Sequence, residues 1–122
     1  MAIEVNKLHP LFGAELTGVD ATKPDQALVS LVEDLMREHA VLCIRGQSHM
    51  DDERHLAFAR AFGPLELPGN KPHRGGRVAF GLYDVSNLGP DGEIADPDSP
   101  RAKVAKGNEL FHADSSYNDL PS

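Results

Sequence analysis

The stretch PDQALVSLVEDLMREHAVLCIRG, residues 24–46, decides the fold because it joins one helix directly to one strand. In its first part, apolar residues recur every three or four positions, which is the spacing of one helical face. These apolar residues are Leu28, Leu31, Val32, Leu35 and Met36. The stretch therefore predicts an amphipathic helix whose apolar side packs on a core.

Both ends of this helix have recognisable signals. Thr22 suits an N-cap, Pro24 suits an early helical position, and Asp25 is favoured near the positive end of the helix. Arg37 and His39 fall in the expected last turn, where positive charge is favoured. Residues 40–44 (AVLCI) then form a continuous apolar run of strand length, which predicts a fully buried strand.

Shorter elements are expected on either side. Residues 3–8 predict a short edge strand, and residues 14–19 a second extended piece that pairs with it. Ser48 and Asp51 are candidate caps for a second helix, which the Gly-Pro pair at 63–64 ends. Its expected inner face consists of Leu56, Ala59 and Phe62.

The remaining chain has weaker signals. Residues 65–77 are rich in Pro and Gly, and residues 78–87 are expected to be extended. Residues 89–107 predict a loop of about twenty residues, long enough to be either disordered or functional, for example as a lid. Regular structure is expected to resume near Asn108 and to lead into His112, with Leu110 and Phe111 entering a core.

Composition bounds the class of protein. The chain has 122 residues, 40% of them apolar, a formal net charge of −7 and one cysteine. Its length predicts one domain, and its acidity argues against a nucleic-acid-binding protein. No apolar run is long enough to cross a bilayer, and the start does not resemble a secretory signal. We expect a cytoplasmic protein without a disulfide.

His112 and Asp114 are the candidates for chemistry. Residues two apart on an extended segment point to the same side of the backbone, so an imidazole nitrogen and a carboxylate oxygen can reach one metal ion. With a second histidine, such a pair makes the facial triad of non-haem Fe(II) oxygenases. On its own this pair is a weak signal, and in isolation a solvated histidine beside an aspartate is the favoured interpretation.

The surrounding residues resemble the family of taurine and 2,4-dichlorophenoxyacetate dioxygenases, which use Fe(II) and 2-oxoglutarate. Residues 108–117 (NELFHADSSY) are similar to the metal-binding segment of that family, with Phe111 in place of its commoner Trp. Further similar segments follow in the family's order along nearly the whole chain: 8–12 (LHPLF), 41–47 (VLCIRGQ), 58–66 (FARAFGPLE) and 84–92 (DVSNLGPDG). The last segment is most like the phenoxyalkanoate-degrading branch.

The resemblance implies particular roles for residues. His112 and Asp114 would be the iron ligands, and Asn108 and Tyr117 would line the substrate pocket. Lys71 lies in a variable loop and is a candidate partner for a substrate carboxylate, although an exposed loop lysine is equally consistent. The third metal ligand and the arginine that binds 2-oxoglutarate would lie beyond Ser122, in the part of longer family members that has no counterpart in these 122 residues.

The resemblance also implies a fold and an activity. The fold is α+β, the N-terminal portion of a double-stranded β-helix (jelly roll) with two flanking helices, and residues 1–122 are then a single partial domain. The activity is hydroxylation of a small carboxylate, with dioxygen as co-substrate. For an aryloxyalkanoate such as a phenoxyacetate, hydroxylation next to the ether oxygen gives an unstable hemiacetal.

Two alternatives remain open. A sulfonate of the taurine type would be a different substrate for the same chemistry. A non-catalytic fragment or binding module would keep the N-terminal half of the fold, expose apolar strand edges and associate with other chains. We expect a homo-oligomer.

Overall fold

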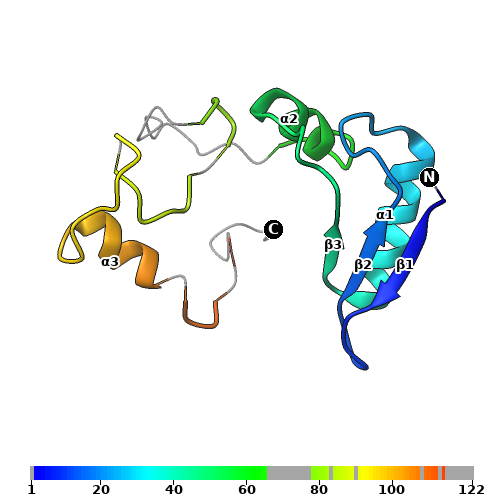
Figure 1. Ribbon diagram of the computed structural model, residues 1–122, viewed down its shortest axis with the longest axis horizontal. Helices are drawn as coiled ribbons and strands as arrows, with labels where there is room; N and C mark the ends of the chain where they lie inside the picture. The colour runs from blue at the N-terminus through cyan, green and yellow to red at the C-terminus, as the bar shows by residue number, and fades with distance from the viewer. Residues whose placement is uncertain are drawn as a thin grey trace. The chain divides into compact units, whose positions relative to one another are not determined.

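Three short strands form one sheet, with order β1-β2-β3 (Figure 1). The computed structural model describes residues 2–65, 78–82, 84–89, 91–107, 109–112 and 114. Strand β1 (Glu4–Lys7) pairs antiparallel with β2 (Ala14–Thr17), and β2 pairs parallel with β3 (Leu42–Ile44). The predicted edge strand and its pairing with the second strand are thereby confirmed.

Helix α1 (Gln26–His39) connects the two parallel strands. Its N-cap is Asp25, whose carboxylate accepts a hydrogen bond from the Leu28 backbone N–H at 2.8 Å. The prediction of Thr22 as the cap was wrong, because the Thr22 hydroxyl donates instead to the carboxylate of Asp20. Pro24 therefore precedes the helix and does not occupy its first turn.

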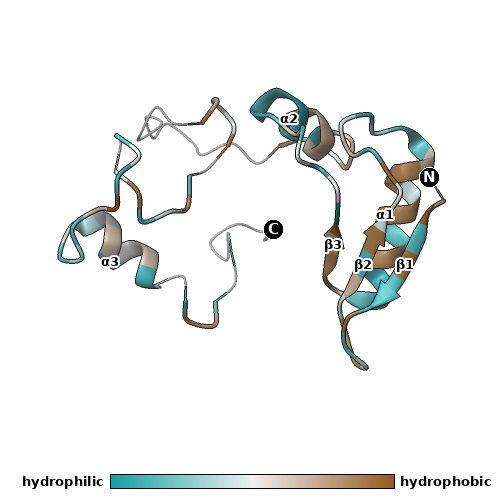
Figure 2. Cartoon of the chain, viewed as in Figure 1, coloured by the Kyte–Doolittle hydropathy of each residue, from teal (hydrophilic) through white to brown (hydrophobic). Residues whose placement is uncertain are grey.

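The core lies between α1 and one face of the sheet. Leu16 is fully buried and packs with Leu28, Val32 and Leu35 of α1. Figure 2 shows hydrophobic residues on α1, β2 and β3, where this contact is made. The helical periodicity thus identified the buried face, except that Met36 is 44% exposed. His39, in the last turn as predicted, is buried.

Strand β3 is only half-buried, so the prediction of a fully buried strand was wrong. Ile44 pairs with Leu16 and shares the face that α1 covers. Cys43 pairs with Glu15 and therefore lies on the opposite face, where the Arg45 Nε atom is 2.6 Å from Oε2 of Glu15. A sheet that is apolar on one face and polar on the other leaves its strands partly exposed.

Helix α2 (Asp52–Arg60) begins at its N-cap Asp51, as predicted for that residue. The Asp51 carboxylate accepts from the Arg54 N–H at 2.9 Å. Leu56 is buried, whereas Phe62, expected on the inner face, is 37% exposed. Phe58 packs against the core in its place, and its ring centroid lies 5.1 Å from that of Phe62.

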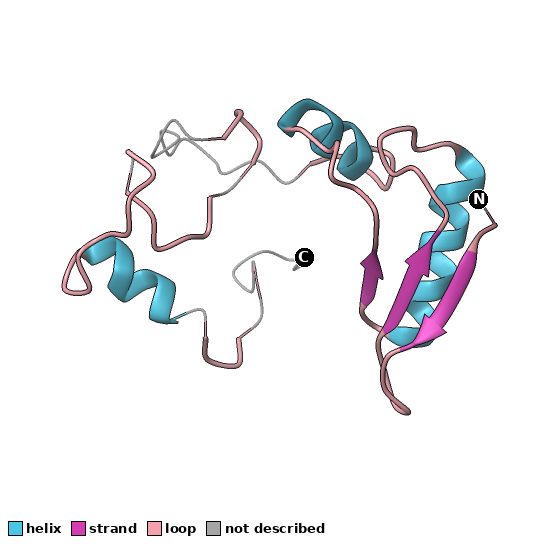
Figure 3. Cartoon of the chain, viewed as in Figure 1, coloured by secondary structure: helices cyan, strands magenta, loops and turns pink. Residues whose placement is uncertain are grey.

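The chain divides into two compact units, Met1–Lys71 and Pro72–Ser122. Among the described residues of the second unit, the expected extended segment at 78–87 contains no strand, and backbone pairing is limited to an isolated bridge between Leu88 and Ile94. Helix α3 (Pro100–Gly107) occupies the end of the segment predicted to be a loop (Figure 3). That part of the prediction was wrong.

Candidate metal site

Helix α3 precedes the predicted metal-binding segment in the sequence. Ser99 begins the helix, because its hydroxyl accepts a hydrogen bond from the Ala102 N–H at 3.2 Å. After the helix, the Glu109 N–H donates to the Lys106 carbonyl and the Leu110 N–H to the Gly107 carbonyl, both at 3.2 Å. These bonds attach Glu109 and Leu110 to the last turn of α3.

The imidazole of His112 is oriented by its own backbone. Its Nδ1 atom lies 2.7 Å from the Leu110 carbonyl oxygen. A carbonyl oxygen only accepts, so Nδ1 is the nitrogen that carries the proton in this contact. The Nε2 atom is then the one available to bind a metal, which is the arrangement that metal-ligating histidines usually show.

Nε2 of His112 faces the carboxylate of Asp114. The distance from Nε2 to Oδ1 is 3.2 Å, and the two side chains are 44% and 78% exposed. Two adjacent ligands of one metal ion, each bonded at about 2.1 Å, have donor atoms about 3 Å apart. The pair therefore fits two neighbouring coordination positions, and one nitrogen with one carboxylate oxygen is a donor set that suits Fe(II).

The backbone that approaches His112 differs from the one predicted. Glu109 lies in a turn and Leu110 and Phe111 in bends, so the extended segment expected before His112 was wrong, while Ala113 lies outside the described residues. Leu110 is 72% exposed and Phe111 is fully exposed, so neither enters a core among the described residues. No sequence pattern indicates the contact between the His112 ring and the Leu110 carbonyl.

The other predicted site residues, Asn108, Tyr117 and Lys71, lie outside the described residues. Within the part of the chain that the structure describes, His112 and Asp114 have no third His, Cys, Asp or Glu close enough to complete a metal site.

A second polar cluster joins two loops of the first unit. The Asp20 carboxylate accepts hydrogen bonds from Thr22 and from Nε2 of His49, the latter at 3.1 Å. These bonds, led by that from the Thr22 hydroxyl, hold the pKa of Asp20 well below its usual range. Gln47 strengthens the same junction, since its side chain bonds the Ala21 N–H and the carbonyls of Val19 and Arg45.

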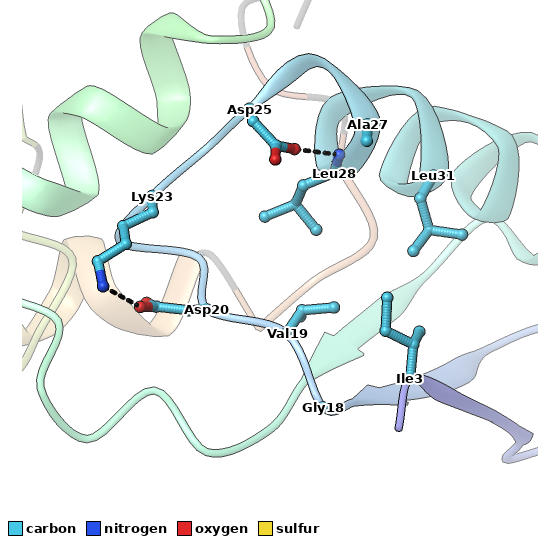
Figure 4. Close-up of a pocket in the computed structure, with 9 residues that line it drawn as sticks. All are labelled: Ile3, Gly18, Val19, Asp20, Lys23, Asp25, Ala27, Leu28 and Leu31. Carbon is cyan, nitrogen blue, oxygen red and sulfur yellow. Dashed lines mark hydrogen bonds and ion pairs between the residues drawn. The ribbon is translucent and has the colours of Figure 1, made fainter. Parts of the chain in front are cut away.

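A hollow of about 300 Å³ lies beside this junction (Figure 4). Its apolar wall includes Ile3, Leu28 and Leu31, and its polar rim includes the ion pair between Lys23 and Asp20 at 3.5 Å. No predicted site residue lines it. In the described part of the chain, no helix is both long and apolar enough to span a membrane.

Comparisons with known proteins extend over nearly the whole chain. Residues 4–122 match the family described as "Taurine catabolism dioxygenase TauD, TfdA family". The chain is 38% identical to the alpha-ketoglutarate-dependent 2,4-dichlorophenoxyacetate dioxygenase of Cupriavidus pinatubonensis, over 96% of this chain and 42% of that protein. It is 34% identical to the (S)-phenoxypropionate/alpha-ketoglutarate-dioxygenase of Sphingobium herbicidovorans, over 95% of this chain and 36% of that protein.

A solved structure agrees with these matches. The crystal structure of AAD-2 in complex with Mn(II) and N-oxalylglycine superposes with a TM-score of 0.83 and 36% identity, over 98% of this chain and 40% of that one. The chain spans about two fifths of the length of the relatives it matches. On the match of residues 4–122, the chain belongs to the TauD/TfdA family of dioxygenases.

Proposed function

We propose that the protein is an Fe(II)- and 2-oxoglutarate-dependent dioxygenase that hydroxylates aryloxyalkanoate carboxylates. The observation on which this rests is the 3.2 Å separation of His112 Nε2 and Asp114 Oδ1, in a chain of the TauD/TfdA family. His49 and Asp20 make a similar contact at 3.1 Å, so the support for a metal-binding role of His112 and Asp114 comes from the family match together with their separation.

In this proposal, His112 binds the iron through Nε2 and Asp114 through Oδ1. The carboxylate offsets part of the metal charge, and the bond from Nδ1 to the Leu110 carbonyl holds the imidazole ring in place. A histidine and a 2-oxoglutarate-binding arginine beyond Ser122 complete the site. An iron held by these residues would supply oxidation by dioxygen, with one oxygen atom going to succinate as 2-oxoglutarate loses carbon dioxide and the other to the hydroxylated substrate.

The substrate class is proposed from the names of two relatives. Relatives that match along the chain are named for 2,4-dichlorophenoxyacetate and (S)-phenoxypropionate, which are carboxylates next to an aryl ether. Hydroxylation of the carbon beside the ether oxygen gives a hemiacetal, which breaks into a phenol and an oxo acid. Asn108, Tyr117 and Lys71 are proposed to line the substrate pocket, with Lys71 pairing with the carboxylate.

The remaining fold is proposed to be the double-stranded β-helix, and residues 89–107 a lid over the substrate. The outer edge of β3 pairs with no other described strand, so it offers backbone groups to a further strand. Helix α3 forms the last part of the lid segment and is bonded to Glu109 and Leu110 through the Lys106 and Gly107 carbonyls. Movement of the lid would therefore act directly on the position of His112.

An anaerobic titration of the full-length protein with Fe(II) and 2-oxoglutarate tests the proposal. The metal-to-2-oxoglutarate charge-transfer absorption should appear, and His112→Ala should abolish it. His55→Ala is the matched control, since His55 is an exposed histidine of α2 in the other unit and should leave the band unchanged. A band that survives His112→Ala would contradict the assignment of this ligand.

Product analysis then separates the substrate classes. With phenoxyacetate, the proposal predicts equal amounts of phenol and succinate. Succinate formation coupled to sulfite release from taurine, without phenol from phenoxyacetate, would favour the sulfonate alternative. The absence of both metal binding and turnover in the full-length protein would favour the non-catalytic alternative.

A further inference from the structure

The outer edge of β1 is open to a further strand. β1 lies at one edge of the three-stranded sheet and pairs only with β2 among the described strands (Figure 1). All four of its residues are exposed. An edge strand presents backbone N–H and C=O groups that can pair with a strand of another chain. β1 is thus a candidate surface for association through backbone hydrogen bonds.

The hydrogen bonds of the hairpin identify which groups face outward. The Leu8 N–H donates to the Gly13 carbonyl at 2.9 Å, so these two residues form a hydrogen-bonded pair. Bonded and non-bonded pairs alternate along an antiparallel ladder, and the register from Leu8 back to Glu4 is continuous. Val5 and Lys7 therefore occupy non-bonded positions, and their N–H and C=O groups point away from β2.

The chain before β1 continues along the same line. A Cβ atom at Gly18 would lie 3.1 Å from the Cα atom of Ile3, so Ile3 runs beside Gly18, the next pair in the register. Two residues separate Ile3 from Val5, and its backbone groups therefore also point outward. The open edge consists of Ile3, Val5 and Lys7.

The side chains at this edge leave it accessible. Val5 pairs with Leu16 and shares the face of the sheet that α1 covers, yet Val5 is 41% exposed and Ile3 is 56% exposed. The uninterrupted register of β1 with β2 excludes a bulge within the described strand. Lys7 does not shield the edge either, because its ammonium is drawn to the Glu38 carboxylate of α1, at 3.6 Å.

We propose that β1 pairs antiparallel with β1 of a second copy of this chain, around a two-fold axis beside Val5. In this register Val5 faces its own counterpart and Ile3 faces Lys7 of the second copy, so all outward backbone groups of the edge are paired. An axis at Glu4 would set two glutamates against each other, which is unfavourable. An axis at Asn6 would replace the contact between the two valines with a valine facing a lysine.

Charge favours the same register. Lys7 of the second copy would lie opposite Ile3, whose side chain lines the hollow beside α1 (Figure 4). Among the residues that line this hollow, Asp20 and Asp25 are acidic and Lys23 is basic. A lysine arriving on this side therefore meets a net negative charge. The edge is complementary to itself in backbone, apolar contact and charge, so the occupant is a second copy, and this holds independently of the proposed function.

Disulfide trapping in the full-length protein tests the register. With the native cysteines, Cys43 among them, replaced by serine, Val5→Cys should give a disulfide-linked dimer under mild oxidation. Facing residues of a hydrogen-bonded antiparallel pair have Cα atoms about 5.5 Å apart, within the span of a disulfide. Glu4→Cys is the matched control, because Glu4 faces Asn6 of the second copy and should give no such dimer. Equal cross-linking at both positions would contradict the register.

Sedimentation velocity at micromolar concentration provides a second measurement. The wild type should sediment as a dimer. Val5→Lys should sediment as a monomer, because it places two like charges against each other at the axis. Val41→Lys makes the same change at a valine that is 53% exposed and lies outside β1, and it should remain dimeric. Circular dichroism shows whether both variants are folded.

The remaining outcomes decide against or for the proposal. A monomeric wild type overturns it, and so does a dimer that persists in folded Val5→Lys. Dissociation of Val41→Lys together with Val5→Lys also overturns it, because the loss would then not be specific to β1. If Val5→Lys does not fold, the disulfide experiment decides: cross-linking of Val5→Cys without cross-linking of Glu4→Cys supports the pairing, and its absence refutes it.

Discussion

Asp20 and His49 are 29 positions apart in the sequence, and their side chains meet at 3.1 Å, joining the loop after β2 to the loop after β3. The two strands run parallel, so both loops leave the sheet at the same edge. Hydrogen bonds from Thr22 and His49 favour the ionised form of Asp20 and lower its pKa. The junction therefore links the stability of the first unit to pH.

The sign of this pH dependence follows from the lowered pKa. The folded protein binds a proton at Asp20 less readily than the unfolded chain does, so the contribution of this carboxylate is complete above about pH 5 and is lost as the pH falls below about 4. Asp20→Asn should lower the thermal midpoint at pH 7. Between about pH 5 and pH 2, the thermal midpoint of this variant should fall less steeply than that of the wild type. Thermal melts between about pH 7 and pH 2 measure both effects.

The control for this experiment is Asp34→Asn, which removes an exposed carboxylate of α1 that contacts Arg37. The thermal midpoint of Asp34→Asn should fall with decreasing pH as steeply as that of the wild type. If Asp20→Asn and the wild type lose stability in parallel on acidification, the proposed linkage is wrong.

Gln47 should contribute more to stability than a typical exposed glutamine. Its side chain makes three hydrogen bonds to backbone groups, including the N–H of the buried residue Ala21 at 2.9 Å. Gln47→Ala leaves that N–H without its partner and should cost about 1–3 kcal/mol of unfolding free energy, measured by urea denaturation. Gln26→Ala, which removes one long exposed contact to Ser30, should change it by less than about 0.5 kcal/mol.

Gly18 and Gly46 allow backbone strain to be separated from a steric clash. Both have positive φ, +79° and +78° respectively. A Cβ atom at Gly18 would lie 2.1 Å from the Ala2 carbonyl oxygen, whereas one at Gly46 would meet nothing within 4 Å. Gly46→Ala should therefore cost only the strain of about 1–2 kcal/mol.

Gly18→Ala should cost clearly more, because the segment at Ala2 must move away from the end of β2. Thermal denaturation of the two variants provides the comparison. Equal losses of stability would mean that the contact between Ala2 and residue 18 contributes nothing.

Leu16 is the fully buried large side chain of the described core. Leu16→Ala removes its contacts with α1 and leaves a cavity, so it should cost about 2.7–5 kcal/mol. Leu11→Ala makes the same chemical change at a side chain that is 85% exposed and should cost under about 0.5 kcal/mol. Chemical denaturation with a constant m-value would measure both, and a similar cost at the two positions would argue against the packing described.

Asp114 should be required for metal affinity in the full-length protein. Mn(II) serves as a redox-stable probe, and the spin-resonance signal of free Mn(II) reports binding. Asp114→Ala should weaken binding by more than about 100-fold, because loss of a residue that only orients a ligand already costs about 10–100-fold. Asp98→Ala, at a carboxylate that is 95% exposed and faces Lys103, should leave binding unchanged. Retained affinity in Asp114→Ala would remove this residue from the site.

Sequence reasoning succeeded where burial determines structure. The spacing of Leu28, Val32 and Leu35 follows from the need to cover Leu16, so periodicity alone located α1 and its buried face. It could not tell which of Thr22 and Asp25 caps the helix, since both residue types are suitable. The choice depends on Asp20, which engages the Thr22 hydroxyl.

Prediction was weaker where local hydrogen bonds determine structure. Helix α3 has little apolar periodicity, so the sequence of residues 100–107 did not indicate a helix. The acidic and Pro-containing residues before it suggested a loop throughout. The Ser99 cap begins the helix nevertheless. The pairing of His112 with Asp114 was expected from strand alternation, whereas residues 109–111, just before the pair, form a turn and bends. The bond to the Leu110 carbonyl that orients the ring involves backbone, which every residue type offers equally.

The parallel pairing of β2 with β3 also sets an order of assembly during synthesis. The hairpin of β1 and β2 closes between near neighbours, Lys7 with Ala14, as soon as residue 17 has emerged. Ala14 pairs with Leu42, so the third strand must wait until the intervening helix has left the ribosome and shortened the distance between them. The partners of the β1–β2 pairing are therefore synthesised before those of the β2–β3 pairing, and the hydrophobic interior requires α1.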